Sequence, residues 1–273
     1  MLSTERPDKA ANHLLSGRVV VIVNGSPYVL IMPCVFVDFL SSAEDPNLKF
    51  QYANLLKFVR LVAFFITLLL PGLYVAITNF HQEIIPTELL FAIVASRESV
   101  PFPIIVEILA MEISFELIRE ASLRVPSPIG TTIGIIGALI LGQAAVEASI
   151  VSPILIIIVA ITGITSFAIP DFYLSFHLRI VRFLYIIAGF LAGFLGIGIV
   201  LFSHLVLLCS LKSFGVSYLA PFVPATSKNN KAYFMPPFWN REKRPDFLNT
   251  KRPQKEARIS MKWKYKIGGN NGN

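Results

Sequence analysis

Charged residues are scarce in this sequence, and so are cysteine and histidine. Lys, Arg, Asp and Glu make up 15% of the 273 residues, whereas a soluble domain carries about a quarter. The two cysteines and four histidines have neither metal-site nor redox spacing. A phosphate-binding glycine loop, a Ser/His/Asp grouping and a catalytic carboxylate pair are also missing. We therefore expect a protein that is not an enzyme and that holds no metal or cofactor.

Hydrophobic residues make up 54% of the chain, and the mean hydropathy is +0.65. They are gathered in blocks, and a helix of about 20 residues is long enough to cross a bilayer of about 30 Å. The blocks lie at 61–80, 100–118, 131–150, 151–169 and 183–211. The sequence therefore predicts an α-helical polytopic membrane protein with four to six membrane helices, preceded by a short interfacial helix at 86–95.

The positive charge is concentrated at the C-terminal end. From Lys212 onward there are 13 Lys and Arg residues against three acids, so the tail carries a net charge of +10 and the rest of the chain −3. A basic tail after the last apolar block is typical of a cytoplasmic flank, or of a segment on anionic lipid headgroups. We expect it to be largely disordered and to bind membrane lipids, with no nucleic acid as partner.

The basic flanks do not alternate simply across the membrane. Arg60, Arg119, Arg179 and the tail all favour the cytoplasmic side. A single span at 183–211 would leave the tail outside. Three alternatives resolve the conflict: the 29-residue block 183–211 doubles back, the segment 100–118 does not cross, or the tail breaks the rule.

The segment 100–118 is apolar but contains three glutamates. Each acid at the bilayer centre costs about 2.5 kcal/mol or more, so the segment is either buried against protein or lies in the interface as an amphipathic helix. We interpret its charges as gating or subunit-contact groups. Structural pairing of the carboxylates with Arg97 or Arg119 is the alternative. The candidate residues are Glu107, Glu112, Glu116, Arg119 and Glu120.

The block 131–150 carries small residues at every fourth position, which permits close helix approach. Glu147 is its only acid. One hypothesis is that this helix lines an ion path and that Glu147 forms a ring of negative charge at one mouth. The alternatives are that the glycines serve packing and that Glu147 lies in headgroup water. The candidate ion-path residues are Gln143, Glu147, Gly134, Gly137 and Gly142.

The N-terminal region has a different pattern. Two β-rich runs at 18–23 and 28–32 flank the turn residues Asn24 and Gly25, which predicts a β-hairpin. A lone hairpin is marginally stable in water, so we expect it to be a remnant of a larger domain. We divide the chain into a remnant of a cytoplasmic domain (1–45), a transmembrane domain (46–214) and a basic tail (215–273).

Several long motifs are distributed along the chain. They are ESVPFP at 98–103, EILAMEISFELIREA at 107–121, PIG at 128–130, GALILGQAAVEA at 137–148, SFAIP at 166–170 and SFGVSYLAP at 213–221. Together they resemble the A subunits of spore germinant receptors, the GerA family. The resemblance extends over nearly the whole chain, from the hairpin to RPDFL at 244–248. A related spore membrane protein of the stage V operon shares much of the core.

The resemblance implies a multi-pass protein of the inner spore membrane. It implies a homo-oligomeric ring, with five as the expected number, that forms a nutrient-gated cation path. The implied partners are a transporter-like B subunit and a lipoprotein C subunit. Family members carry a large soluble domain before the hairpin, so we expect most of that domain to be missing here. A secondary transporter and a non-conducting scaffold for the receptor complex are the alternative functions.

Overall fold

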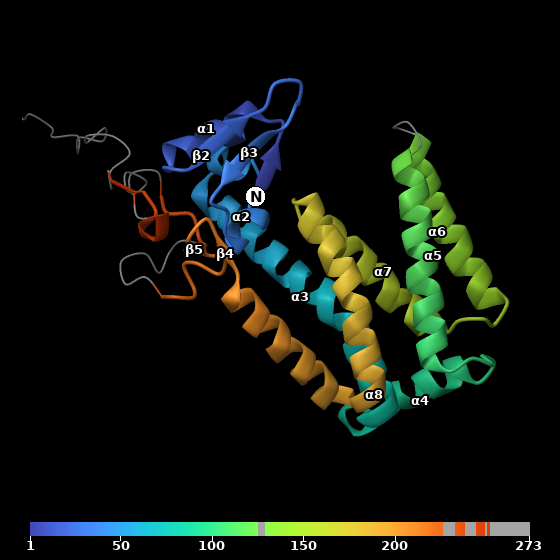
Figure 1. Ribbon diagram of the computed structural model, residues 1–273. Coiled ribbons are helices and arrows are strands. Elements are labelled where there is room, and N and C mark those ends of the chain that lie inside the picture. Colours follow the sequence, from blue (N-terminus) through green and yellow to red (C-terminus); the bar gives the residue numbers. More distant parts are fainter. Residues whose placement is uncertain (125–128, 226–232, 238–243, 249, 252–273) are drawn as a thin grey trace, which may run out of the picture. The chain divides into compact units, whose positions relative to one another are not determined.

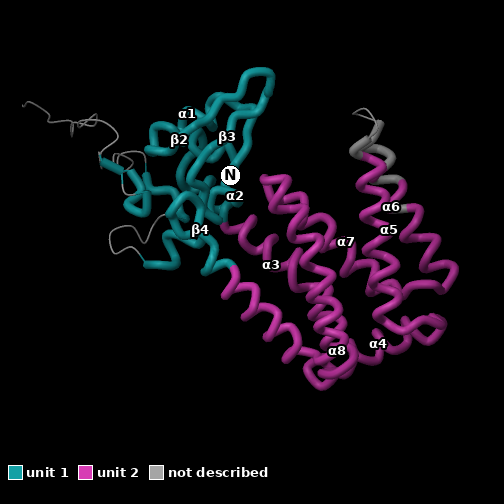
Figure 2. Tube along the Cα trace, viewed as in Figure 1, with its two compact units in different colours: residues 1–57, 208–273 teal, residues 58–207 magenta. Residues whose placement is uncertain are grey.

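The computed structural model describes residues 1–124, 129–225, 233–237, 244–248 and 250–251. The chain forms two compact units (Figure 2): residues 1–57 with 208–273 make unit 1, and residues 58–207 make unit 2. Helices α3 (Phe50–Phe80) and α8 (Phe172–Ser210) run from one unit into the other. The domain boundaries that we placed at 45/46 and 214/215 stay predictions.

Unit 1 contains the predicted hairpin. Strand β2 (Val19–Ile22) pairs antiparallel with β3 (Val29–Met32), and Gly25 in the turn has a φ of +83° that glycine adopts without strain. A third strand, β1 (Leu2–Thr4), pairs with the other edge of β3, and helix α1 (Pro7–Leu15) lies between β1 and β2 in the sequence. The sheet order is therefore β1-β3-β2. Sequence analysis missed β1 because three residues carry no measurable periodicity.

The rest of unit 1 joins the sheet to the described parts of the tail. Backbone N–H of Phe36 donates to the Tyr218 carbonyl over 2.8 Å. The side-chain amide of Asn54 exchanges two hydrogen bonds with the backbone of Met235. The predicted disorder of the tail concerns residues that mostly lie outside those described. The short elements of this unit are α2 (Phe36–Phe39), a 3-10 turn at Asp45–Asn47, β4 (Lys212–Ser213), β5 (Val216–Ser217) and a 3-10 turn at Asp246–Leu248.

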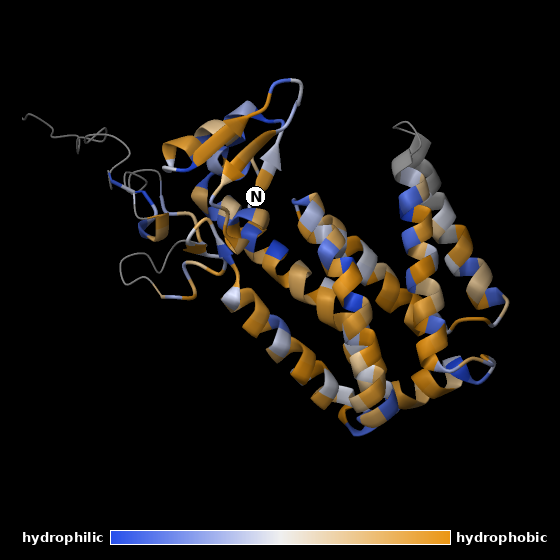
Figure 3. Ribbon diagram, in the orientation of Figure 1, coloured by the Kyte–Doolittle hydropathy of each residue, from blue (hydrophilic) through white to orange (hydrophobic). Residues whose placement is uncertain are grey.

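The regular elements in the described part of unit 2 are helices, and their ribbons are predominantly hydrophobic (Figure 3). Among the described residues, α3 and α8 are long and apolar enough to cross a membrane, and the shorter helix α7 is also apolar. The predicted count of four to six membrane helices stays a prediction. Between α3 and α8 the chain forms a 3-10 turn (Gln82–Ile84), α4 (Thr87–Arg97), α5 (Ile104–Arg124), α6 (Ile129–Glu147) and α7 (Pro153–Phe167).

Helix α8 doubles back on itself. Its helical backbone is interrupted at Ala192 and Gly193, and Gly193 has φ +58° and ψ −139°. On a straight helix Tyr185 and His204 would be about 28 Å apart along the axis, yet the Tyr185 hydroxyl lies 3.3 Å from His204 Nδ1. The bend is visible as the yellow and orange arms in Figure 1. Of the three ways to resolve the charge conflict, the structure therefore contains the first.

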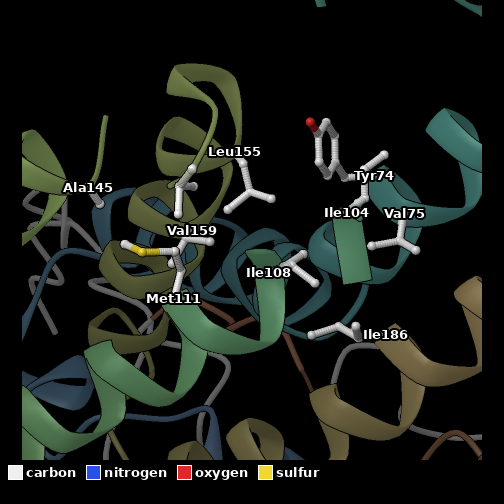
Figure 4. Close-up of a cluster of buried hydrophobic side chains, with 10 residues drawn as sticks. Tyr74, Val75, Ile104, Ile108, Met111, Ala145, Leu155, Val159 and Ile186 are labelled. Carbon is white, nitrogen blue, oxygen red and sulfur yellow. The ribbon is translucent and has the colours of Figure 1, made fainter. Parts of the chain in front are cut away.

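Two glycines allow α3 and α8 to cross at backbone contact. A Cβ atom on Gly72 would lie 2.7 Å from the Tyr185 carbonyl oxygen, and one on Gly189 would lie 2.5 Å from the Gly72 carbonyl oxygen. Both positions therefore exclude any larger residue. Beside this crossing, buried side chains from five helices form one hydrophobic cluster that fixes α5 within unit 2 (Figure 4). Its members include Tyr74, Val75, Ile104, Ile108, Met111, Ala145, Leu155, Val159 and Ile186.

Candidate functional site

Two acids of helix α5, Glu107 and Glu112, are buried. Ile104, Ile108 and Met111 recur at helical spacing and pack into the hydrophobic cluster. Glu107 and Glu112 are five residues apart, about 140° around the helix, and each residue is only 1% exposed. A carboxylate buried to this degree must be paired or hydrogen-bonded. The structure supplies a partner to each of them.

Glu107 joins three segments of unit 2. Its Oε1 lies 3.0 Å from Arg97 Nη2 at the end of α4, and its Oε2 accepts the backbone N–H of Ser152 over 3.1 Å. Ser152 precedes the first residue of α7. The carboxylate therefore holds the end of α4 and the start of α7 against α5.

Glu112 and Glu116 join α5 to the first arm of α8. Glu112 Oε2 lies 2.5 Å from Arg182 Nη2, and Glu116 Oε1 lies 2.5 Å from Arg179 Nη1. The two acids are four residues apart and the two arginines are three apart, so both pairs form between one face of each helix. The Glu112 pair is deeply buried, whereas the side chain of Glu116 is 35% exposed.

Arg119 and Glu120 of α5 have less buried settings. Arg119 lies with its guanidinium carbon 4.5 Å from the centre of the Phe167 ring, and its Nη2 is 3.5 Å from the Gly163 carbonyl oxygen. Glu120 lies on the exposed side of α5. The structure therefore groups Glu112, Glu116 and Arg119 near α7 and α8, and it places Glu107 apart from them at the α4 end.

These contacts decide how the carboxylates are paired, but their part in gating or subunit contact stays a prediction. Arg97 and Arg119 are the two partners predicted for structural pairing, and Arg97 binds Glu107. Sequence analysis missed Arg179 and Arg182 as partners of the other two acids. Their three-residue spacing, opposite a pair of acids four apart, is the signal that could have suggested the match.

The candidate ion-path residues fall on two sides of α6. Gln143 and Glu147 are exposed, and Gln143 Nε2 donates to Glu147 Oε1 over 3.2 Å. The three glycines instead face other helices. Their added Cβ atoms would meet Ser122 Oγ at 2.8 Å (Gly134), Ile118 Cγ2 at 3.6 Å (Gly137) and Ile156 Cγ2 at 3.6 Å (Gly142). The glycines thus serve the contacts of α6 with α5 and α7, and the polar pair lies on the outer face.

Within the described part of the chain, no group of three or more His, Cys, Asp or Glu side chains is placed to hold a metal ion. His177 and His204 approach with ring centres 6.1 Å apart, between the two arms of α8. His204 also lies 3.3 Å from the Tyr185 hydroxyl. We therefore interpret these side chains as packing contacts between the two arms of the helix.

Comparison with known proteins gives the family. The profile described as "Bacillus/Clostridium GerA spore germination protein" matches residues 1–247. Spore germination protein KA of Bacillus subtilis (strain 168) is 49% identical over 250 residues, which cover 91% of this chain and 46% of that protein. Spore germination protein GerLA of Bacillus cereus is 42% identical over 252 residues, covering 92% and 51%.

A third relative is named as a membrane protein. The uncharacterized membrane protein YfkQ of Bacillus subtilis (strain 168) is 41% identical over 259 residues, covering 93% of this chain and 50% of that protein. No solved structure matches the chain significantly. The chain spans about half the length of these relatives. The matched profile and these identities confirm the resemblance in the motifs: this chain belongs to the GerA family of spore germination proteins.

Proposed function

We propose that this chain is a membrane subunit of a nutrient-responsive spore germination receptor, and that several copies form a ring around a cation path. The outer face of α6 lines that path, and Glu147 supplies the negative charge at one mouth. In this proposal the protein spans the inner membrane of the spore several times. It assembles with a transporter-like B subunit and a lipoprotein C subunit.

The observation that carries the proposal is the division of acids between the two helices. The three buried or half-buried carboxylates of α5 are bound to arginines of the same chain. Glu147 is exposed on α6, where it accepts a hydrogen bond from the neutral amide of Gln143. An exposed carboxylate on an otherwise apolar helix attracts cations when it faces water in a pore. It would be costly facing lipid tails.

A second candidate function is a secondary transporter. Discontinuous helices are typical of transporter binding sites, and α8 is interrupted at Ala192 and Gly193. The interruption here turns the chain back instead of continuing it across the bundle. We therefore favour the channel, and the coupling of ion flux to nutrient uptake distinguishes the two.

Replacing Glu147 by glutamine is expected to reduce the preference of the receptor for cations over anions. The ring loses one negative charge per copy, while the amide keeps the size and hydrogen-bonding capacity of the side chain. The measurement is the reversal potential of the nutrient-triggered current across a KCl gradient, in vesicles that contain this chain with its proposed partners. The reversal potential should move most of the way toward zero.

Glu83→Gln is the matched control, since Glu83 is an exposed acid outside α6, and it should leave the reversal potential at the wild-type value. A Glu147→Gln receptor that conducts with unchanged cation preference would remove Glu147 from the path.

A further inference from the structure

The turn between α6 and α7 is tightly held at both ends. Ser149 has a positive φ of +55°, and the backbone N–H groups of Ile150 and Val151 both point to the Ala145 carbonyl at 2.9 and 3.3 Å. Val151 is 2% exposed. Glu147 is the last residue of α6, so it lies at the edge of this turn. Whatever fixes the turn also fixes where the Glu147 carboxylate lies.

The far end of the turn is held from outside by Glu107. The N–H of Ser152 donates to Glu107 Oε2, and the side chain of Ser152 makes no capping bond to α7. The carboxylate therefore accepts the N–H of the residue that precedes the helix, which is the bond that an acid at the third helical position makes in a capping box. A charge-assisted hydrogen bond of this kind is about twice as strong as a neutral one.

Glu107 is in turn held by α4. Its side chain is fully buried, while that of Arg97 is 26% exposed. Arg97 Nε is buried and makes no hydrogen bond within the described part of the chain, and Nη2 donates to Glu107 Oε1. Ile93 is the single buried residue of α4. The short helix α4 thus contributes one buried apolar side chain, Ile93, and the Arg97 ion pair to the bundle.

We infer that Glu107 and Arg97 are positioning residues that hold the α6–α7 turn, so that the place of α4 determines where Glu147 lies. Arg97 orients the Glu107 carboxylate, and the carboxylate fixes Ser152. Ser152 is five residues from Glu147, across a turn that its own backbone bonds keep compact. The inference rests on the proposed cation path for its effect on ions, but the geometry of the turn can be tested without any current.

The first test measures the turn directly in the full chain. Val151→Cys places a thiol in the buried turn, and the exposed Cys209 is replaced by serine. With Arg97→Gln added, a charged thiol reagent should react about tenfold faster or more, as expected for loss of one charge-assisted hydrogen bond. The control Glu98→Gln changes the exposed neighbour of Arg97 and should leave the rate unchanged. Equal rates with and without Arg97→Gln would overturn the inference.

A charge swap separates the two contacts of Glu107. Arg97→Glu with Glu107→Arg restores an ion pair between α4 and α5, but arginine has no acceptor for the Ser152 N–H. The thiol at position 151 should therefore still react fast with the reagent in the swapped protein. A return to the slow wild-type rate would show that the ion pair alone holds the turn, and would contradict the role of the Ser152 contact.

The second test uses the sign of the effect on ion selectivity. Removing the positive charge of Arg97 would by direct electrostatics raise the preference for cations. Displacement of Glu147 predicts the opposite, a fall toward the selectivity of Glu147→Gln. The inference would be contradicted if Arg97→Gln raised the cation preference or left it unchanged, and if the thiol at position 151 still reacted slowly with the reagent. That result would leave the cation path intact. A wild-type receptor without any nutrient-triggered current would contradict the proposed function alone, since the thiol rates still decide the role of Arg97.

Discussion

Replacing Gly193 by alanine is expected to destabilise unit 2 by about 3 kcal/mol or more, because a backbone region that is nearly exclusive to glycine alone costs about 1–3 kcal/mol for other residues. Gly193 has φ +58° and ψ −139°, and a Cβ atom there would lie 2.8 Å from His81 Cε1 and 3.2 Å from Phe80 Cβ. The cost of the backbone strain and the cost of the steric clash add, because a rotation of the Gly193 backbone would not remove the clash with either neighbour. The measurement is the midpoint of helix loss on heating the detergent-solubilised chain.

Gly198→Ala is the matched control, and its effect should have the opposite sign. Gly198 lies in the second arm of the same helix, and a Cβ atom there meets nothing within 4 Å. Alanine in a helix interior is more favourable than glycine by roughly 0.5–1 kcal/mol. Equal midpoints for the Gly193 and Gly198 variants would contradict a chain reversal at Ala192 and Gly193.

Arg182→Gln is expected to cost about 3–5 kcal/mol, the penalty for leaving one member of a buried ion pair without its partner. Glu112 is 1% exposed, and its Oε1 makes no hydrogen bond within the described residues. Its Oε2 depends on Arg182 Nη2 at 2.5 Å. The same thermal measurement in detergent reports the loss. Arg6→Gln is the control, because it breaks only exposed ion pairs with Asp8 and Glu44 and should leave the midpoint nearly unchanged.

Removing both members of the buried pair should be less damaging than removing one. In Glu112→Leu with Arg182→Met, no charge remains without a partner, so stability should recover part of what Arg182→Gln loses. The double variant should nevertheless fail to respond to nutrient if α5 and α8 must keep their register. A double variant less stable than Arg182→Gln would show that Arg182 serves another partner.

The sequence predicts the elements of this fold well where the pattern is local. The apolar blocks at 61–80, 131–150 and 151–169 correspond to α3, α6 and α7 within a few residues, apart from the longer start of α3. The hairpin around Asn24 and Gly25 is confirmed. Each of these signals lies within one continuous segment, so neither packing nor chain topology is needed to read it.

The reversal of α8 could not be located from the sequence. Gly189, Gly193, Gly196 and Gly198 are equal candidates by spacing, and the structure gives them four different settings. Gly189 meets the backbone of α3, Gly193 turns the chain, Gly196 lies against the Ala188 carbonyl, and Gly198 meets nothing. The difference arises from which helix lies opposite, which a local pattern does not contain.

The pairing of the α5 acids was equally out of reach. Glu112 and Arg182 are 70 residues apart in sequence, and Glu116 and Arg179 are 63 apart. Their contact exists because the first arm of α8 lies opposite α5. The charge pattern does predict that the carboxylates need partners, since unpaired acids among apolar residues are too costly. It offers Arg97 or Arg119 for the three acids together, and in the structure Arg97 pairs with Glu107.

The most direct test of the central claim is the flux of K⁺ into vesicles that contain this chain with its B and C partners, measured together with uptake of the triggering nutrient. The account predicts a nutrient-triggered K⁺ flux that requires this chain and that proceeds without nutrient accumulation. The same flux in vesicles lacking this chain, or a fixed ratio of K⁺ to nutrient taken up, would contradict it.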